Sequence, residues 1–320
     1  MRVGFAVKVL GDGGLPSHDT RRWQSGPHLS ESLRRLEAIL ERLDALDIRM
    51  YRMTSDLAPY ATHPDLPQFH RQVEECSEQL AHVGARARAL GIRLSFHPGQ
   101  YVVLNSERAD VQALAARELD LLAGLLDAMG CGPEAVVVLH VGGAAGGRDA
   151  AFGRFESGLA ALSDAGRRRL VIENDDRSFS LADVLVLKER TGLSVVWDVL
   201  HHHCLDRDAI PDADALRLAL ATWPEGVVPK IHFSSPKTAI EERREQKGRR
   251  VVTRLVLPPL RAHADMVDPI AFEEFVRGPA AGLRFDTMLE AKGKDLALLR
   301  LRDHLVQRGF DWQDGALRAG

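Results

Sequence analysis

Eight short apolar runs alternate along the chain with longer segments of helical periodicity, and this alternation constrains the fold more than any other feature. The strand-like runs are Val3–Val9, Ile48–Met53, Ile92–Phe96, Ala135–Leu139, Leu170–Ile172, Val195–Trp197, Val227–Ile231 and Leu283–Leu289. The helical segments are Ser30–Leu46, Gln68–Leu90, Val111–Met129, Ala150–Leu162, Ser178 or Ser180 to Arg190, Asp212–Ala221, Ile270–Val276 and Asp295–Gln307. Eight successive βα units predict an α/β fold, a (β/α)8 TIM barrel in a single domain over residues 1–320. A doubly wound open sheet is the structural alternative.

Two polar stretches interrupt the alternation. Gly11–Gly26 is a long segment with Gly and Pro after the first strand. Ser234–Ala262 follows the seventh strand and is longer than an ordinary βα loop. It holds eight Lys or Arg residues against three Glu, a local charge of +5 in a chain of formal net charge −3. Its composition fits either a solvated excursion or an arm that contacts phosphates beside the active face.

Composition excludes several classes of protein. The 42 Lys and Arg against 45 Asp and Glu exclude a strongly basic nucleic-acid coat. The sequence shows no signal peptide and no run of eighteen apolar residues, so we expect no contact with a membrane. Three cysteines (Cys76, Cys131, Cys204) cannot build a disulfide framework, which favours a cytoplasmic protein. The unusual number is thirteen His, since histidine is the commonest metal ligand and acid/base group near neutral pH.

Chemically active side chains stand at the ends of six consecutive predicted strands. The third to eighth runs lead to His97, His140, Glu173, Asp198 with His201, His232 beside Lys230, and Glu290. One such His is ordinarily a satisfied rim residue, and one such carboxylate is often a helix N-cap. Because the C-terminal strand ends of a TIM barrel converge on one face, six together predict an active site there.

These residue types indicate a cluster of metal ions. Three neighbouring carboxylates repel one another unless they are protonated or neutralised by cations. Mixed imidazole and carboxylate ligands suit Zn²⁺, Mn²⁺ or Fe²⁺ better than Ca²⁺, and their number exceeds one tetrahedral site. Clustered metals favour phosphodiester hydrolysis, although sugar isomerases on barrels also use such ligands. His63 and His263 lie in suitable loops, but spacing alone leaves their roles open.

Three loop motifs remain. Pro98-Gly99 predicts a tight turn that projects Gln100 and Tyr101 beyond the rim, either as a wedge into a duplex or with Tyr101 packed back on the barrel. Among His201–His203, we expect only His201 to face the site. The Gly-rich segment 142–147 lacks the GxGxxG spacing, so we interpret it as a loop and expect no nucleotide cofactor.

In these segments the sequence resembles the UV damage endonuclease family, in its bacterial form. The resemblance runs from about Arg2 to Arg302 and is carried, in order, by Ser95–Tyr101, Leu139–Gly143, Ile172–Asp176, Asp198–His202, Pro229–His232 and Leu289–Lys294. It implies a barrel similar to that of endonuclease IV with two or three divalent ions, Mn²⁺ first and Zn²⁺ or Mg²⁺ as alternatives. The implied activity nicks UV-damaged double-stranded DNA immediately 5′ to cyclobutane pyrimidine dimers and 6-4 photoproducts, leaving a 3′-hydroxyl and a 5′-phosphate.

The family motifs also imply roles for individual residues. The implied metal ligands are His63, His97, His140, Glu173, Asp198, His201, His232, His263 and Glu290. Gln100 and Tyr101 match the lesion-probing pair. Lys230 joins Glu173 and Glu290 as a catalytic residue, as a neutral or carboxylated lysine, since an ammonium beside cations would be costly.

The sequence departs from some relatives at the first strand. Phe5 and Val9 stand where those relatives have Tyr and Asn, so no Tyr hydroxyl is expected there, and Lys8 is a conceivable substitute. Two rival functions stay open: a sugar isomerase or epimerase on the same barrel, and a lesion-binding protein without chemistry. We expect the chain to act as a monomer.

Overall fold

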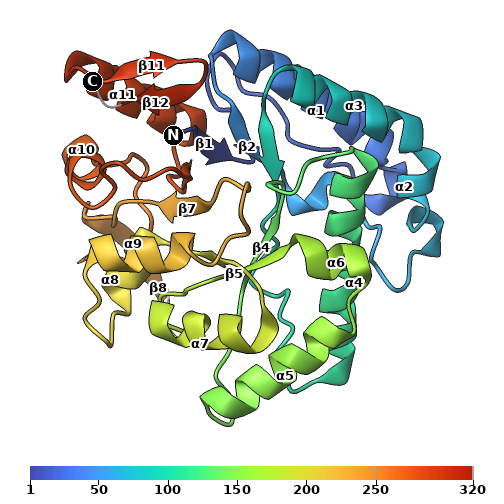
Figure 1. Cartoon of the computed structure of the whole chain (residues 1–320). Helices are drawn as coiled ribbons and strands as arrows, with labels where there is room; N and C mark the ends of the chain where they lie inside the picture. Colours follow the sequence, from blue (N-terminus) through green and yellow to red (C-terminus); the bar gives the residue numbers. More distant parts are fainter. Residues whose placement is uncertain (249, 319–320) are drawn as a thin grey trace.

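Eight parallel strands close into a barrel in the computed structural model, which describes residues 1–248 and 250–318 (Figure 1). The barrel strands are β1 (Val3–Ala6), β2 (Met50–Arg52), β3 (Arg93–Ser95), β4 (Val137–His140), β5 (Leu170–Glu173), β6 (Val195–Val196), β7 (Lys230–Phe233) and β10 (Asp286–Leu289). They pair in the orders β3-β2-β1-β10-β7 and β4-β5-β6. Parallel bridges Phe96–Val137 and Asp198–His232 join the two sets at both ends. The closure confirms the TIM barrel, because an open doubly wound sheet would keep two edges.

Helices surround the strands (Figure 1), and seven of the eight predicted helices are present with shifted ends. They are α1 (Leu29–Ala45), α2 (Gln72–Glu75), α3 (Ser77–Ala89), α4 (Ala109–Ala128), α5 (Arg148–Ala160), α6 (Asp164–Arg169), α7 (Leu181–Thr191), α8 (Val199–Cys204), α9 (Asp212–Leu220), α10 (Pro269–Arg277) and α11 (Lys294–Gln307). The single helix predicted over 68–90 is wrong, because Cys76 leaves helical geometry (φ −107°, ψ 18°) and separates α2 from α3. Ser180, not Ser178, caps α7 through a capping box with Asp183.

The bounds of all eight barrel strands differ from the sequence prediction, and two of the differences have clear local reasons. The first strand ends at Ala6 instead of Val9, because Val7 has a φ of 68°, which a β-branched residue adopts only under constraint. The seventh strand covers Lys230–Phe233 instead of 227–231. Pro229 precedes it and cannot donate a ladder hydrogen bond, so the ladder starts after it.

A buried ion pair fills the barrel interior at the N-terminal ends of β3 and β10. Arg93 donates to Asp286 Oδ2 at 2.9 Å, and Arg2 Nε donates to the same oxygen at 2.8 Å. Arg93 also donates to the Val228 carbonyl at 2.9 Å. The small C-terminal hairpin of β11 (Asp311–Gln313) and β12 (Ala316–Arg318) covers the chain start, where Leu317 N donates to the Met1 carbonyl at 2.8 Å.

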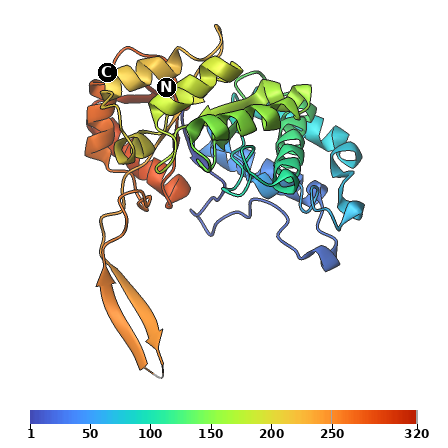
Figure 2. The same cartoon turned by 90° about the horizontal axis from the view of Figure 1, so that it is seen from below.

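The basic stretch after β7 forms a long antiparallel hairpin of β8 (Glu241–Lys247) and β9 (Arg250–Val256). Figure 2 shows it extending away from the barrel, on the same side as the segment between β1 and α1. Arg249, one of the eight basic residues counted above, lies outside the described residues. None of the helices in the described ranges has the length and apolar character needed to cross a membrane.

Candidate metal centre

Glu173 lies at the centre of a group of side chains from the C-terminal ends of the strands. His97 Nε2 is 2.9 Å from Glu173 Oε2, and His232 Nδ1 is 2.9 Å from Oε1. His201 Nδ1 lies 3.6 Å from Oε1, and His140 Nε2 lies 3.8 Å from Oε2. One carboxylate thus contacts imidazoles from β4, β7, α8 and the segment after β3.

The strand register places these residues at one level of the barrel. His140 and Glu173 are direct partners between β4 and β5, and Asp198 is bridged to His232. Glu290 follows the last residue of β10, and its Oε1 lies 3.3 Å from His232 Nδ1. The convergence predicted from the strand ends is therefore present.

Three overlapping groups of side chains have the spacing of metal ligands, and all of them contain Glu173. The groups are His97-Glu173-His232, His140-Glu173-His201 and Glu173-Asp198-His232-Glu290. His263 borders the last group, with Nδ1 3.7 Å from Glu290 Oε2 and 2.8 Å from the Glu290 carbonyl oxygen. His263 thus joins the centre from the loop after the basic hairpin.

Burial and charge set the protonation of these side chains. Burial alone would raise the pKa of Glu173, but the neighbouring His232 and His140 outweigh it, and the pKa lies well below the ordinary value. Burial lowers the pKa of His140, which favours the neutral imidazole that binds metals. Burial also lowers the pKa of His201, yet Asp198 and Glu173 outweigh it and raise that pKa to about 9.

Several buried polar atoms here lack a hydrogen-bond partner among the described residues. They are Asp198 Oδ2, His232 Nε2 and His140 Nδ1. Unpaired buried polar atoms are rare and costly in folded proteins. Carboxylate and imidazole atoms of this kind match the ligands of Mn²⁺ and Zn²⁺, so the residues present fit a metal cluster.

Lys230 lies two residues before His232 in β7, so both side chains point to the same face of the strand. Its side chain is completely buried, and its Nζ has no hydrogen-bond partner among the described residues. Burial, with Arg93 and Arg52 nearby, holds its pKa well below the ordinary value. The direction of this shift is toward the neutral amine, and the role of Lys230 stays a prediction.

Comparison with known proteins assigns the chain to a family. The family model for the UV-endonuclease UvdE matches residues 27–311. The chain belongs to this family of UV-endonucleases. It is 33% identical to the UV DNA damage endonuclease of Bacillus velezensis over 81% of this chain and 75% of that one. The crystal structure of SacUVDE matches with a TM-score of 0.79 and 31% identity over 96% of this chain and 99% of that one.

A structure of L-ribulose 3-epimerase shares the fold alone, with a TM-score of 0.54 and 15% identity over 99% of this chain and 90% of that one. Family membership instead makes the chain an endonuclease, an enzyme that acts on DNA. The isomerase alternative therefore agrees with the barrel fold but not with the family to which the chain belongs.

The turn after β3 of this UV-endonuclease presents Gln100 and Tyr101 to solvent. Val102 N donates to the Gly99 carbonyl at 3.0 Å, which closes the turn. Tyr101 is 79% exposed, so it does not pack back on the barrel. Gln100 lines a cleft of about 420 Å³ whose wall includes His140 and His201. The turn thus stands directly beside the candidate metal centre.

His63 is the one candidate ligand that lies apart. Among the described residues it belongs to none of the three groups, and its exposed ring lies against Tyr60 with centroids 6.3 Å apart. It lines a cavity of about 850 Å³ together with His18 and Tyr101. Its role as a ligand stays a prediction.

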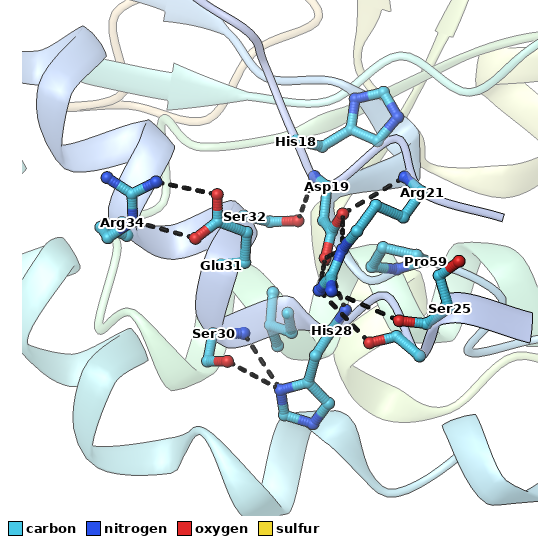
Figure 3. Close-up of polar contacts among 12 residues, drawn as sticks. His18, Asp19, Arg21, Ser25, His28, Ser30, Glu31, Ser32, Arg34 and Pro59 are labelled. Carbon is cyan, nitrogen blue, oxygen red and sulfur yellow. Dashed lines mark hydrogen bonds and ion pairs between the residues drawn. The ribbon is translucent and has the colours of Figure 1, made fainter. Parts of the chain in front are cut away.

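The segment between β1 and α1 forms one wall of that cavity and is held by Asp19 (Figure 3). Arg21 Nη2 donates to Asp19 Oδ2 at 2.6 Å, and the backbone N–H of His28 donates to the same oxygen at 3.0 Å. Asp19 N donates to Ser32 Oγ at 2.9 Å. These bonds fix a long polar segment that the sequence indicated only as irregular.

Sequence reasoning missed two residues of the centre. Arg52, the last residue of β2, forms an ion pair with Glu290. Asn174, completely buried, accepts from Asp198 N at 2.9 Å and donates to the Asp198 carbonyl at 3.0 Å. Arg52 also stands at a strand end, so the rule that identified the other residues could have found it.

The first-strand departures are also accounted for. Phe5 is completely buried and packs edge-on against Tyr51, with ring centroids 5.6 Å apart. The Tyr51 hydroxyl donates to the Val7 carbonyl at 2.6 Å. Val9 is buried, and Lys8 is exposed. Phe5 and Val9 therefore serve packing in this chain.

Proposed function

We propose that this UV-endonuclease is a metal-dependent DNA-repair enzyme that nicks duplex DNA immediately 5′ to pyrimidine dimers and 6-4 photoproducts. The products would carry a 3′-hydroxyl and a 5′-phosphate. The observation that carries the proposal is the set of three overlapping ligand groups around Glu173. We also propose that residues 1–320 act as one catalytic domain and as a monomer.

The proposed cluster holds two or three divalent ions, Mn²⁺ first, with Zn²⁺ or Mg²⁺ as alternatives. Its ligands would be His63, His97, His140, Glu173, Asp198, His201, His232, His263 and Glu290. When bound, such ions supply Lewis-acid stabilisation of the phosphate and lower the pKa of water. Glu173 would hold more than one ion, because it belongs to all three groups. Neutral imidazoles such as His140 would contribute ligand atoms without adding positive charge.

Lys230 would contribute through its neutral amine. A neutral lysine amine adds to carbon dioxide, forms a carbamate and releases a proton. The carbamate would bring a further anionic oxygen pair below His232, where an ammonium would be repelled by the ions. An intact-protein mass one carbon dioxide above the sequence mass, lost in Lys230→Met, would support this state. An unmodified mass in bicarbonate buffer would contradict it.

Gln100 and Tyr101 would probe the duplex for damage. The exposed Tyr101 ring can enter a poorly stacked step, which is the cheapest step to open. The cavity of about 850 Å³ beside Tyr101 has the size of sites that enclose small ligands, and it would receive displaced bases. Deformability of the damaged step, rather than base identity, would then determine selectivity.

The direct test is incision of UV-irradiated supercoiled plasmid by Glu290→Gln. We expect incision to be abolished while binding of damaged DNA is retained, because the change removes one ligand charge and keeps the side-chain shape. Glu189→Gln, the same change at a site that is 76% exposed on α7, should incise like the wild type. Unchanged incision by Glu290→Gln would refute the metal assignment. Wild-type binding to irradiated plasmid without incision in Mn²⁺ would favour the lesion-binding rival.

A further inference from the structure

The β8–β9 hairpin has no role in closing the barrel. It forms a separate two-stranded sheet, and its apolar residues Val251 and Leu255 are 65% and 72% exposed. Isolated two-stranded hairpins are marginally stable in water. Seven paired residues in each strand therefore form a feature that the fold itself does not require.

The register separates the hairpin into two faces of different charge. Arg243 lies directly opposite Arg254, and Arg250 lies four residues before Arg254 on the same face. Like charges directly opposite one another destabilise a sheet. Glu241 and Glu245 share this face, but each approaches an arginine only to 3.9 Å.

The local acidic groups leave this face positively charged. Glu241 is engaged by Lys237, whose Nζ lies 2.6 Å away. Arg243 and Arg254 keep 58% and 55% of their side chains exposed. The opposite face pairs Arg244 with Thr253 and Glu242 with Leu255, so its described charges balance. The face of Arg243, Arg250 and Arg254 is called here the arginine face.

The base of the hairpin is fixed beside the candidate metal centre. Pro236 is bridged to His263, and Lys237 N donates to the Ala262 carbonyl at 2.6 Å. Ala264 N donates to the Ser235 carbonyl at 2.9 Å. Because β7 carries His232 and the returning chain carries His263, the hairpin, which projects away from the barrel in Figure 2, begins and ends beside the centre.

We propose that the arginine face binds the phosphates of undamaged duplex DNA that flanks the scissile bond. This inference rests on the proposed function for its substrate. A polyanion relieves the repulsion between Arg243 and Arg254, and a two-stranded ribbon fits a DNA groove. Seven residues at about 3.3 Å each reach about 23 Å. At about 3.4 Å per base pair, this corresponds to about seven base pairs of flanking duplex.

The experiment measures binding of the intact enzyme to an undamaged 30-base-pair duplex at a series of salt concentrations. Arg243→Gln/Arg250→Gln/Arg254→Gln should reduce the salt slope of log K by about 2.7, at about 0.9 per phosphate contact. Between 50 and 200 mM salt, the wild type should therefore lose about 40-fold more affinity than the variant. Arg244→Gln on the opposite face is the matched control for Arg243→Gln and should keep the wild-type slope. Circular dichroism should show equal melting temperatures, because the changed side chains are at the surface.

Duplex length gives a second measurement. Shortening the flank on one side of a thymine dimer below about seven base pairs should weaken wild-type binding and leave the triple variant unaffected. Equal salt slopes for the wild type and the triple variant, or equal effects of Arg243→Gln and Arg244→Gln, would overturn the inference. A dimer in sedimentation that Leu255→Ser dissociates, with unchanged salt slopes, would assign the hairpin to a second copy of the chain and would also overturn it. If the slopes change as expected but irradiated plasmid is not incised, only the proposed function fails.

Discussion

Asn174 shows how a single uncharged residue determines the geometry of the metal centre. Its side-chain amide makes two bonds to the backbone of Asp198, and its backbone carbonyl oxygen lies 3.0 Å from His201 Nδ1. Asp198 Oδ1 in turn accepts from His201 N at 2.8 Å. The side chain thus orients Asp198, and the backbone of the same residue orients His201, while neither would contact an ion. Such supporting partners typically change metal affinity by about 10–100-fold when they are removed.

Asn174→Ala should therefore raise the Mn²⁺ concentration needed for half-maximal incision by about 10–100-fold. Incision at saturating Mn²⁺ should recover most of the wild-type rate, because the ligands themselves are intact. Asn105→Ala is a matched control: this amide is equally buried, but it holds the Gly143 carbonyl of a loop at 2.7 Å. It should lower stability without shifting the metal requirement. An equal shift in both variants would indicate a general loss of structure.

The sequence predicted most of the centre, because one rule of parallel barrels covers it. A polar residue at the end of an apolar run is visible without a structure, and Glu173, Asp198 and Glu290 were found in this way. Asn174 was not identified, because it is uncharged and because its role is to hold the backbone of Asp198, which comes from the neighbouring strand. Whether His63 is a metal ligand likewise depends on the position of its loop, which the spacing of residues along the sequence does not determine.

At the scale of elements, periodicity identified all eight barrel strands and misplaced their ends. Val227 and Val228 extended the predicted apolar run before β7, which begins only at Lys230. The β8–β9 hairpin was indicated only as a basic excursion. Neither face is buried at the side chains whose burial is described, so its alternation carries no hydrophobic signal.

The buried ion pair between Arg93 of β3 and Asp286 of β10 should contribute strongly to stability. Asp286→Asn leaves the guanidinium of Arg93 buried without its counter-charge, and we expect the free energy of unfolding to fall by about 3–5 kcal/mol. Urea unfolding at pH 7 measures it. Asp214→Asn removes a pair with Arg217 in which both side chains are about 60% exposed, and it should cost less than about 1 kcal/mol.

The stability that the Arg93–Asp286 ion pair contributes should depend on pH. Burial would raise the pKa of Asp286, but Arg93 and Arg2 outweigh it, and the pKa lies below the ordinary value. A carboxyl with a lowered folded-state pKa stabilises the protein above its unfolded pKa of about 3.9, and this contribution is lost as the pH falls further. The difference in unfolding free energy between the wild type and Asp286→Asn should thus be constant near pH 7 and shrink below about pH 4. A difference that grows on acidification would contradict the assignment.

At the scale of the whole molecule, the candidate ligands link opposite parts of the barrel. His97 comes from the segment after β3, Glu173 from β5 and Glu290 from the segment after β10. Before metals bind, three carboxylates share one buried region, and their repulsion opposes closure of the ring of strands. Bound divalent ions would reverse this charge and give a chain of net charge −3 a positive surface toward DNA. Metal loading should thus affect stability as well as catalysis.

Mn²⁺ should accordingly raise the melting temperature of the metal-free protein, because ions that bind only the folded state stabilise it. At one hundred times the dissociation constant, the gain is about 2.7 kcal/mol for one site. Calcium should stabilise far less, because imidazole-rich sites disfavour it. Glu290→Gln should lose part of the gain, whereas Glu189→Gln should keep all of it. Scanning calorimetry with each ion measures these shifts, and a full Mn²⁺ shift in Glu290→Gln would place the stabilising ions away from Glu290.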